Sequence, residues 1–289
     1  MPSPETVIQW FTTHKRDLPW RNTDPWGVMV SEFMLQQTPV KRVLPAWTQW
    51  LERWPSPRDL ADSSPADAIR MWANLGYPRR ATRLHQSAQI IAQNHNNQVP
   101  NNFETLITLP GVGDYTANAI LAFAFGQPTV VLDINVRRVI ARAWQGQAHP
   151  TTSPSAIERS FAQSLIAREL NAKATPIWAA ASMELGALVC TATTPQCSIC
   201  PLEETCQWNK LGKPDNTAKP KTQAKYLGSD RAERGRILKI LRLDHAPQSV
   251  HVIRQGASDR EQCDRALQSL ITEGLVVTSG RGKVSLPGD

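Results

Sequence analysis

The sequence of 289 residues has no uninterrupted run of 18 or more apolar residues, so we expect no membrane-spanning helix. Residues 1–10 lack the basic and then apolar segments of a secretory signal, which predicts a cytosolic protein. Internal repeats and low-complexity tracts are also missing. The 41% hydrophobic and 20% charged residues fit a soluble globular protein with a sizeable core, in two or three domains of roughly 100–150 residues.

Cysteine is scarce, and its distribution is uneven. Only five cysteines occur, and four of them fall within 17 residues: Cys190, Cys197, Cys200 and Cys206. Disulfides are not expected in a reducing compartment, so this cluster indicates a metal site. Four thiolates at this spacing can surround one tetrahedral zinc ion or one iron–sulfur cluster. The run has one Cys-x2-Cys pair where zinc ribbons usually have two, and spacing alone leaves both metals open.

The positive charge is modest and concentrated. A net charge of +7 and a pI of about 9.4 are compatible with a polyanionic partner but not specific for one. Residues 209–236 hold eight Lys or Arg against three acids, with three Gly and two Pro. This composition predicts a solvated basic linker, which we place at residues 209–229.

The residues before the linker are predicted to be almost wholly helical. Apolar residues recur at spacings of three and four from residue 6 to residue 189. Two serines mark helix starts, each followed by a proline and an acidic first turn: Ser64 and Ser153. The expected fold class is therefore mainly α.

The residues after the linker predict a small module at residues 230–289. Apolar residues at 237–241 indicate one helix, and residues 258–271 indicate another that opens on a capping sequence and ends before Gly274. Residues 275–286 predict a hairpin of two short strands. Helices followed by a hairpin are the order of a winged-helix module.

A pair of glycines marks a distinctive turn at residues 109–117 (LPGVGDYTA). Both glycines can adopt positive φ, and an apolar helix follows directly. The amides of such a turn point outward and can bind phosphate oxygens; here they belong to Gly111, Val112 and Gly113. The Lys-Ser or Lys-Thr of a nucleotide-binding loop is missing, so a DNA backbone is the better ligand. Because Gly-x-Gly also occurs in ordinary turns, the motif alone leaves the ligand open.

Two acids lie in apolar surroundings: Glu32 and Asp133. A carboxyl among Val, Met and Phe is expected to have a raised pKa, which suits a general acid near neutral pH. A second carboxylate that stays ionised can stabilise a developing positive charge. Two such acids fit the hydrolysis of a glycosidic bond, although a lone acid near a helix end is more often a cap.

Together these motifs resemble the endonuclease III superfamily of DNA glycosylases. The resemblance covers residues 5–208 and rests on the Gly-Val-Gly hairpin, an Asp about twenty residues later and the four-cysteine spacing. It implies a helix–hairpin–helix fold whose catalytic region, residues 1–208, has two helical lobes. The six-helix lobe would span about 22–125, and the iron–sulfur lobe would comprise the N-terminal helix and about 126–208. The resemblance also implies that the cysteines hold a 4Fe–4S cluster rather than zinc.

Three further segments are similar to the MutY-type adenine DNA glycosylases of that superfamily: residues 16–21 (RDLPWR), 31–38 (SEFMLQQT) and 75–77 (LGY). Endonuclease III carries a Lys two residues after the second hairpin glycine, and its amine forms a Schiff base. Here that position is Tyr115. The resemblance therefore implies a monofunctional enzyme of base excision repair. It would hydrolyse the N-glycosidic bond of adenine mispaired with 8-oxoguanine or guanine.

The resemblance also assigns a role to each candidate residue. Glu32 would protonate N7 of the flipped adenine, Asp133 would stabilise the oxocarbenium-like sugar or bond to it transiently, and Tyr115 would position both. The adenine pocket would be lined by Trp20, Arg21 and Leu35. Gln37, Thr38 and Leu75 would contact 8-oxoguanine. Tyr77 would be the wedge that enters the base stack. For Trp20 and Tyr77 plain core packing is the alternative.

Two features depart from the family pattern. Ala180 stands where many members carry a Glu or Gln that contacts adenine, four residues before Glu184. The 80 residues after residue 209 are shorter than the Nudix-like domain that ends typical members. They resemble the abbreviated C-termini of actinobacterial adenine glycosylases.

The expected partner is double-stranded DNA containing an adenine mispair. We expect a monomer in the bacterial cytoplasm, associated with the nucleoid and not with a membrane. The nearest candidates in sequence for a cation that contacts phosphate are Lys210, just after the cluster, and Arg137 and Arg138, with solvated surface charge as the alternative. Two alternatives remain: a mismatch thymine or uracil DNA glycosylase, and a non-catalytic iron–sulfur DNA-binding sensor, against which the presence of both acids counts.

Overall fold

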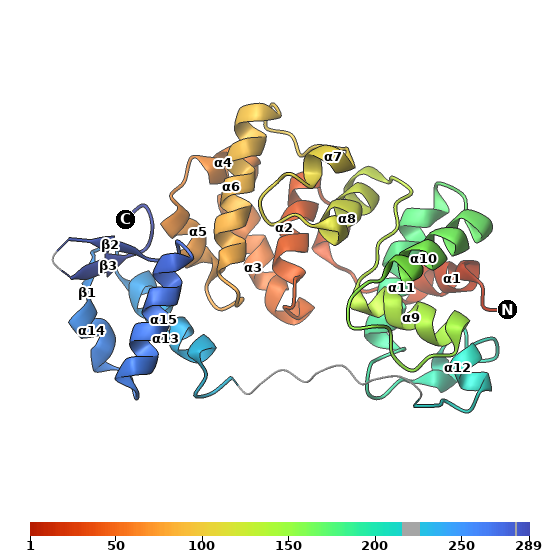
Figure 1. Cartoon of the computed structure of the whole chain (residues 1–289). Coiled ribbons are helices and arrows are strands. Elements are labelled where there is room, and N and C mark those ends of the chain that lie inside the picture. Colours follow the sequence, from red (N-terminus) through yellow and green to blue (C-terminus); the bar gives the residue numbers. More distant parts are fainter. Residues whose placement is uncertain (216–225, 281) are drawn as a thin grey trace. The chain divides into compact units, whose positions relative to one another are not determined.

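The computed structural model describes residues 1–215, 226–280 and 282–289, and the chain divides into two compact units (Figure 1). Unit 1 comprises Met1–Thr23, Asn101–Ile107 and Val112–Thr222, and unit 2 comprises Asp24–Pro100, Thr108–Gly111 and Gln223–Asp289. Helices dominate both units, so the expected mainly α fold class is confirmed. Among the described residues, no helix is long and apolar enough to cross a membrane.

Unit 1 is built around α9, which packs against both α11 and α12, while α1 packs on α11. Its core is apolar and includes Val7 and Phe11 from α1 and Trp178 from α11. The rings of Trp144 and Trp178 meet edge to face with centroids 5.7 Å apart. The elements of the unit are α1 (Pro4–His14), η1 (Pro19–Arg21), α7 (Phe103–Leu106), α8 (Asp114–Phe125), α9 (Ile134–Gln145), α10 (Ala156–Glu169), α11 (Ala174–Leu188), η2 (Cys197–Ile199) and α12 (Gln207–Lys210).

The first part of unit 2 surrounds one buried helix, α2, in which every residue from 26 to 34 is buried. A helix that is apolar all round must be enclosed by its neighbours. Two indole N–H groups fix it: Trp47 donates to the carbonyl of Gly27 at 2.8 Å, and Trp26 donates to that of Trp54 at 3.0 Å. The helices of this part are α2 (Pro25–Leu35), α3 (Val40–Arg53), α4 (Pro57–Ala61), α5 (Pro65–Trp72) and α6 (Arg79–Asn94).

The C-terminal part of unit 2, which we call the C-terminal module, combines helices with a small antiparallel sheet. The predicted hairpin is present as β2 and β3, and the sheet order is β1-β3-β2. Neither β1 nor α14 was predicted, because a two-residue strand has no alternation to detect and a six-residue helix shows less than two turns of periodicity. The elements are α13 (Asp230–Leu243), β1 (Gln248–Ser249), α14 (Val250–Gln255), α15 (Arg260–Thr272), β2 (Val277–Ser279) and β3 (Lys283–Ser285).

Two predicted helix starts need correction. Ser64 caps α5 as expected, accepting from the backbone N–H of Asp67. The start at Ser153 was wrong, because Ser155 is the cap of α10 and forms a capping box with Glu158. Helix α13 begins at residue 230, before its first apolar residue at 237, because Ser229 caps it. Residues 216–225 of the expected linker, and residue 281 of the hairpin, lie outside the described residues.

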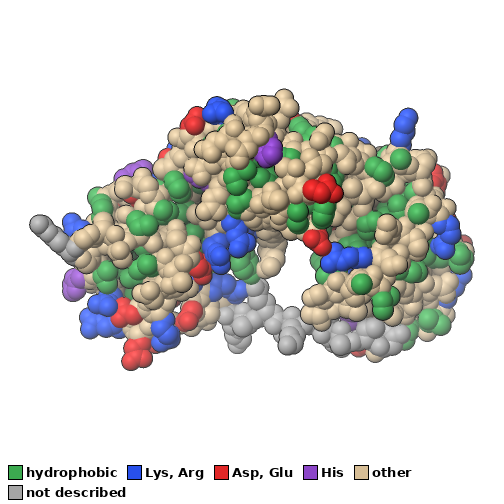
Figure 2. Space-filling model, turned by 45° about the horizontal axis from the view of Figure 1, so that its top comes forward, with side chains coloured by type: hydrophobic (Ala, Val, Ile, Leu, Met, Phe, Trp, Pro, Cys, Tyr) green, Lys and Arg blue, Asp and Glu red, His purple; other side chains and the backbone are tan. Residues whose placement is uncertain are grey.

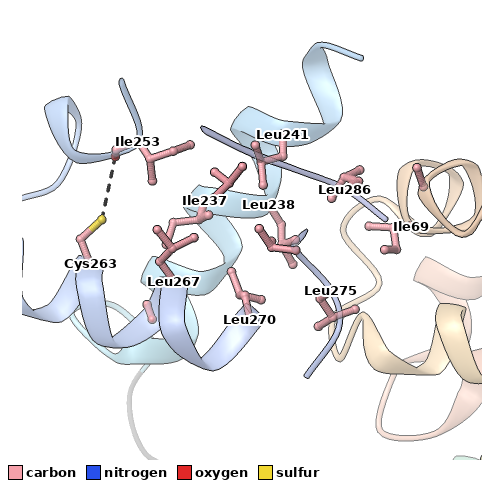
Figure 3. Packing of buried hydrophobic residues seen from close by; sticks show 14 residues of the cluster. Ile69, Ile237, Leu238, Leu241, Ile253, Cys263, Leu267, Leu270, Leu275 and Leu286 are labelled. Carbon is pink, nitrogen blue, oxygen red and sulfur yellow. Dashed lines mark hydrogen bonds between the residues drawn. The ribbon is translucent and has the colours of Figure 1, made fainter. Parts of the chain in front are cut away.

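The C-terminal module shares its core with α5. Ala66 and Ile69 of α5 belong to the same cluster of buried side chains as Leu238 and Leu275 of the module (Figure 3). The guanidinium of Arg70 forms an ion pair at 2.7 Å with the carboxylate of Asp289, whose side chain is 3% exposed. The fifth cysteine, Cys263, is buried in this core and lies in the other unit from the four clustered cysteines.

The surface of the module is mixed in charge. Acidic and basic side chains are interspersed over the face seen in Figure 2. On α15 the exposed Arg260 and Glu261 alternate in sign, and Asp264 pairs with Arg254 at 2.8 Å. A helix that binds phosphate carries an excess of positive charge. The exposed face of α15 does not have that character.

We predict that Ile69→Ala lowers the free energy of unfolding by roughly 2–5 kcal/mol, since Ile69 is fully buried. It should also loosen the module and increase cleavage between residues 209 and 243 in limited proteolysis. Ile91→Ala, at a fully buried residue of α6 outside the shared cluster, is the matched control. Equal cleavage in both variants would contradict the shared core.

Candidate active site and cysteine cluster

Glu32 lies on the last turn but one of α2 and is 5% exposed. The helix begins at the cap residue Asp24, which accepts from the backbone N–H of Gly27 at 2.8 Å. Phe33 and Met34, next to Glu32 in sequence, are both fully buried. The only acid on α2 is therefore held on a rigid, enclosed element.

The loops predicted to contact the opposite base meet at the C-terminal end of α2. The hydroxyl of Thr38 donates to the carbonyl of Leu75 at 3.0 Å, which joins segments far apart in the sequence. Arg80 of α6 bonds both segments and was not among the predicted residues. Because its acceptors are mostly backbone carbonyls, no sequence motif marks it.

Two residues of these loops have left-handed backbone conformations that side chains other than glycine rarely adopt. Gln37 has φ of 57° and Tyr77 has φ of 47°. Such conformations cost about 1–3 kcal/mol each and persist where surrounding contacts hold them. The side chain of Tyr77 is 42% exposed, so core packing, the alternative for this residue, does not apply.

The part of the glycine hairpin that belongs to unit 2, residues 109–111, is fixed to α2 and α6. The hydroxyl of Ser87 donates to the carbonyl of Pro110 at 2.8 Å. Gly111 has φ of +85°, and a Cβ there would lie 2.8 Å from a ring carbon of Phe33. The expectation of positive φ is wrong for Gly113, whose φ is −109°. Gly113 is the N-cap of α8, and a Cβ there would meet no other atom within 4 Å. Val112 is buried, and of the three hairpin residues only Gly113 is exposed.

Asp133 is the N-cap of α9 in unit 1. Its carboxylate accepts from the backbone N–H of Val136 and from the side-chain amide of Asn135, both at 2.7 Å. Burial raises the pKa of Asp133, while these hydrogen bonds and the positive charge of Arg138 oppose the rise. Asp133 is therefore a helix cap in a half-buried, hydrogen-bonded setting.

Arg138 connects Asp133 with the cysteine loop. Its guanidinium donates to Oδ1 of Asn135 at 2.7 Å and to the carbonyls of Gly186 and Cys190 at 2.6 and 2.7 Å. A Cβ on Gly186 would lie 2.8 Å from the backbone oxygen of Asn135, so only glycine permits this approach of α11 to α9. Arg138 and Arg137 are both buried and occupied, which corrects the expectation that they are candidates for phosphate.

The remaining predicted residues of unit 1 lie near α8 and α11. Tyr115, half-buried on α8, packs against a small apolar cluster that includes Ala119 and Ala179. Trp20 is 8% exposed on η1. Arg21 lies 4.9 Å over the ring of Phe11. It also forms an ion pair at 3.1 Å with Glu184.

Glu184 anchors the segment before η1. Its carboxylate accepts from Nε and Nη2 of Arg16 at 2.9 and 2.7 Å, and from the backbone N–H of Arg16 at 2.8 Å. Burial alone would raise the pKa of Glu184, but the bonds from Arg16 and the charge of Arg21 lower it overall. This buried acid fixes residues 16–21 to α11. No role was predicted for it from the sequence, where Glu184 served only to locate the family position that Ala180 occupies.

The four clustered cysteines line one pocket of unit 1, together with Arg142 and Trp208. Burial raises the pKa of the Cys200 thiol to about 12, and the neighbouring thiolates contribute to the rise. Arg142 approaches the sulfur of Cys190 at 3.4 Å and donates to the carbonyls of Thr191 and Ala192. In the part of the chain that the structure describes, no three His, Cys, Asp or Glu side chains are grouped to hold a metal ion.

The candidate residues thus fall into two groups. Unit 2 holds the buried acid and the residues around the C-terminal end of α2: Glu32, Leu35, Gln37, Thr38, Leu75, Tyr77 and Gly111. Unit 1 holds the second acid, the tyrosine, the aromatic segment and the cysteines: Trp20, Arg21, Val112, Gly113, Tyr115, Asp133, Cys190, Cys197, Cys200 and Cys206.

Comparison with known proteins defines the class. A family model described as "HhH-GPD superfamily base excision DNA repair protein" matches residues 30–165. A solved structure of a thermostable thymine-DNA glycosylase superposes with a TM-score of 0.66, covering 72% of this chain and 95% of that one. At 24% identity this similarity shows the fold, which is that of the helix–hairpin–helix glycosylases.

Two curated relatives narrow the class further. The chain is 45% identical over 290 residues to the adenine DNA glycosylase of Mycobacterium tuberculosis, covering 99% of this chain and 94% of that protein. It is 40% identical over 215 residues to the human adenine DNA glycosylase, covering 70% of this chain and 38% of that protein. The chain belongs to the adenine DNA glycosylase family of the HhH-GPD superfamily.

We predict that Glu184→Gln lowers the free energy of unfolding by about 2–3 kcal/mol near neutral pH. This loss is smaller than that for a fully buried ion pair, because Arg16 is partly exposed to solvent. Since the folded-state pKa of Glu184 is lowered, its contribution is present above the ordinary value of 4.5 and is lost as pH falls through the folded-state pKa. Urea unfolding from pH 7 to 3 should therefore show the gap to wild type closing below pH 4.5.

Glu169→Gln is the control, because Glu169 pairs at the surface with the largely exposed Arg168. It should leave stability within about 0.5 kcal/mol of wild type. A gap for Glu184→Gln that stays constant down to pH 3 would contradict the anchoring role of the carboxylate.

Proposed function

We propose that this chain removes adenine paired with 8-oxoguanine or guanine in double-stranded DNA, by hydrolysis of the N-glycosidic bond. The observation that carries the proposal is the 45% identity to an adenine DNA glycosylase over nearly the full length of both chains. The buried Glu32 and the hydrogen-bonded Asp133 supply the two carboxyl groups that such hydrolysis uses.

In the proposed reaction the carboxyl of Glu32 donates a proton to N7 of the flipped adenine. The bond between the sugar and the base then breaks, and its electron pair leaves with the adenine. The carboxylate of Asp133 stabilises the positive charge on the sugar or bonds to it transiently. Water then adds to that carbon, in place of any bond to Asp133, and gives up a proton that restores the carboxyl of Glu32. The hydrogen bonds from Val136 and Asn135 favour the ionised carboxylate that this role requires.

The product of the proposed reaction is an intact strand with a missing base. Tyr115 stands where a Schiff-base lysine would have to be, and a phenol cannot form that adduct. On the family resemblance, Tyr115 would help to position the two acids. Adenine is lined by Trp20, Arg21 and Leu35. The exposed ring of Tyr77 is the wedge in the base stack, and 8-oxoguanine is contacted by Gln37, Thr38 and Leu75.

The four cysteines are proposed to hold a 4Fe–4S cluster. They line one pocket, and their order along the chain, Cys-x6-Cys-x2-Cys-x5-Cys, resembles that of the endonuclease III superfamily, whose members hold such a cluster. A bound cluster would neutralise thiolates that burial disfavours, and would stabilise the loop. Arg142 donates to two carbonyls of that loop and holds it against α9.

The proposed partner is the duplex itself, bound by a monomer. The exposed Gly113 and the N-terminal amides of α8, with the hairpin residues Gly111 and Val112, would receive a phosphate. A cytoplasmic, nucleoid-associated location follows from that substrate. The catalytic region at 1–208, the linker at 209–229 and the module at 230–289 remain predicted boundaries.

We predict that the purified chain releases adenine from A:8-oxoguanine and A:G duplexes and leaves the strand uncut until alkali is added. The test is a single-turnover assay with adenine, thymine and uracil each placed opposite guanine and 8-oxoguanine. Release of thymine or uracil without adenine would favour a mismatch glycosylase instead. Tight duplex binding without release of any base would favour the non-catalytic sensor.

A further inference from the structure

Arg80 makes an unusual set of contacts for a side chain that is only 7% exposed. One terminal nitrogen donates to three carbonyls at the end of α2, those of Phe33, Met34 and Gln36, at 2.8, 2.9 and 2.6 Å. The other donates to the hydroxyl of Thr38 at 2.9 Å and to the carbonyl of Gly76 at 2.9 Å. One guanidinium therefore joins the acid-bearing helix to two loops.

The bonds to α2 act on the turn that directly follows Glu32. The last carbonyls of a helix have no partner within the helix, and a buried helix end needs donors from elsewhere. Arg80 supplies them and places a positive charge at the negative end of the helix dipole. The position of the C-terminal end of α2, and with it the Glu32 carboxyl, thus depends on this guanidinium.

The bonds to the loops act on the residues with left-handed backbone. The guanidinium carbon of Arg80 lies 5.6 Å from the ring centroid of Tyr77 and 5.1 Å from that of Trp72. Its acceptors Gly76 and Thr38 are each adjacent to a residue with positive φ, Tyr77 and Gln37 respectively. The hydrogen bonds of Arg80 thus offset the conformational cost of both turns, and its guanidinium makes a cation–π contact with the exposed ring of Tyr77.

We propose that Arg80 is a positioning residue that couples recognition of the base opposite adenine to the placement of Glu32. The inference rests on the proposed function, in which residues 36–38 and 75–77 read the opposite base; we call these segments the opposite-base loops. A displacement of either loop has to move the guanidinium, and the guanidinium is bonded to the carbonyls that follow Glu32. Binding of 8-oxoguanine by the opposite-base loops therefore changes the position of the Glu32 carboxyl through Arg80.

Lysine cannot replace arginine here. A guanidinium presents five N–H donors in a rigid plane, whereas an ammonium has three donors on one atom. In Arg80 one terminal nitrogen bonds the carbonyls of Phe33 and Met34 and the other bonds Thr38 and Gly76, and a single ammonium nitrogen would lose one of these two sets. Arg80→Lys therefore keeps the charge and breaks the coupling.

The test measures single-turnover adenine release from A:8-oxoguanine and A:G duplexes by wild type, Arg80→Lys and Arg80→Met. Rates are normalised to the active fraction from burst amplitudes, so that a loss of folded protein does not alter the ratio of the two rates. We expect both variants to lower the preference for 8-oxoguanine over guanine by about tenfold, the effect of losing one or two hydrogen bonds.

Arg137→Met is the matched control, since Arg137 is equally buried and bonds Thr151 and Glu158 in unit 1. It should lower the melting temperature without changing the preference. Preference within twofold of wild type in Arg80→Lys would overturn the coupling and leave the enzyme's activity standing. A wild-type chain that releases no adenine from either duplex would overturn the proposed function itself and the coupling with it.

Discussion

The structure depends above all on buried guanidinium groups that donate to backbone carbonyls. Arg80 holds the end of α2 in unit 2, while Arg138 and Arg142 hold the C-terminal end of α11 and the cysteine loop in unit 1. A buried charge is costly unless hydrogen bonds compensate for its lost hydration, so these arginines favour the arrangement of segments in which their terminal nitrogens reach these carbonyls. Each of the two acids lies within three positions in sequence of such an arginine's partners. In both units the position of the candidate acid therefore depends on the contacts of a buried arginine.

The two acids are held by different physical means. Glu32 is enclosed on an apolar helix, whereas Asp133 caps a helix and accepts two hydrogen bonds from groups that Arg138 and the backbone keep in place. Burial raises the pKa of Asp133, and its hydrogen bonds and the charge of Arg138 oppose that rise. The proposed reaction would use Glu32 as the proton donor and Asp133 as the ionised partner.

Sequence reasoning succeeded where side-chain type carries the information. The mainly α fold, the C-terminal hairpin and the family could be predicted from helical periodicity, turn residues and the hairpin and cysteine motifs. It missed Arg80, because the partners of that side chain are carbonyls that every residue possesses. It made Arg138 a candidate for contact with phosphate, although this side chain is buried and bonded, and it allowed positive φ at both hairpin glycines, of which Gly111 has it and Gly113 does not. Such features depend on which segments meet in space, which spacing along the chain does not encode.

The central claim is that Glu32 is the proton donor for adenine release. The most direct measurement compares adenine release and duplex affinity for Glu32→Gln with those of Glu52→Gln, a change at an exposed residue of α3. The account predicts release at least about 100-fold slower for Glu32→Gln with duplex affinity retained, since a neutral amide keeps the shape and cannot donate the proton. Glu52→Gln should behave as wild type. Adenine release by Glu32→Gln at the wild-type rate would contradict the account.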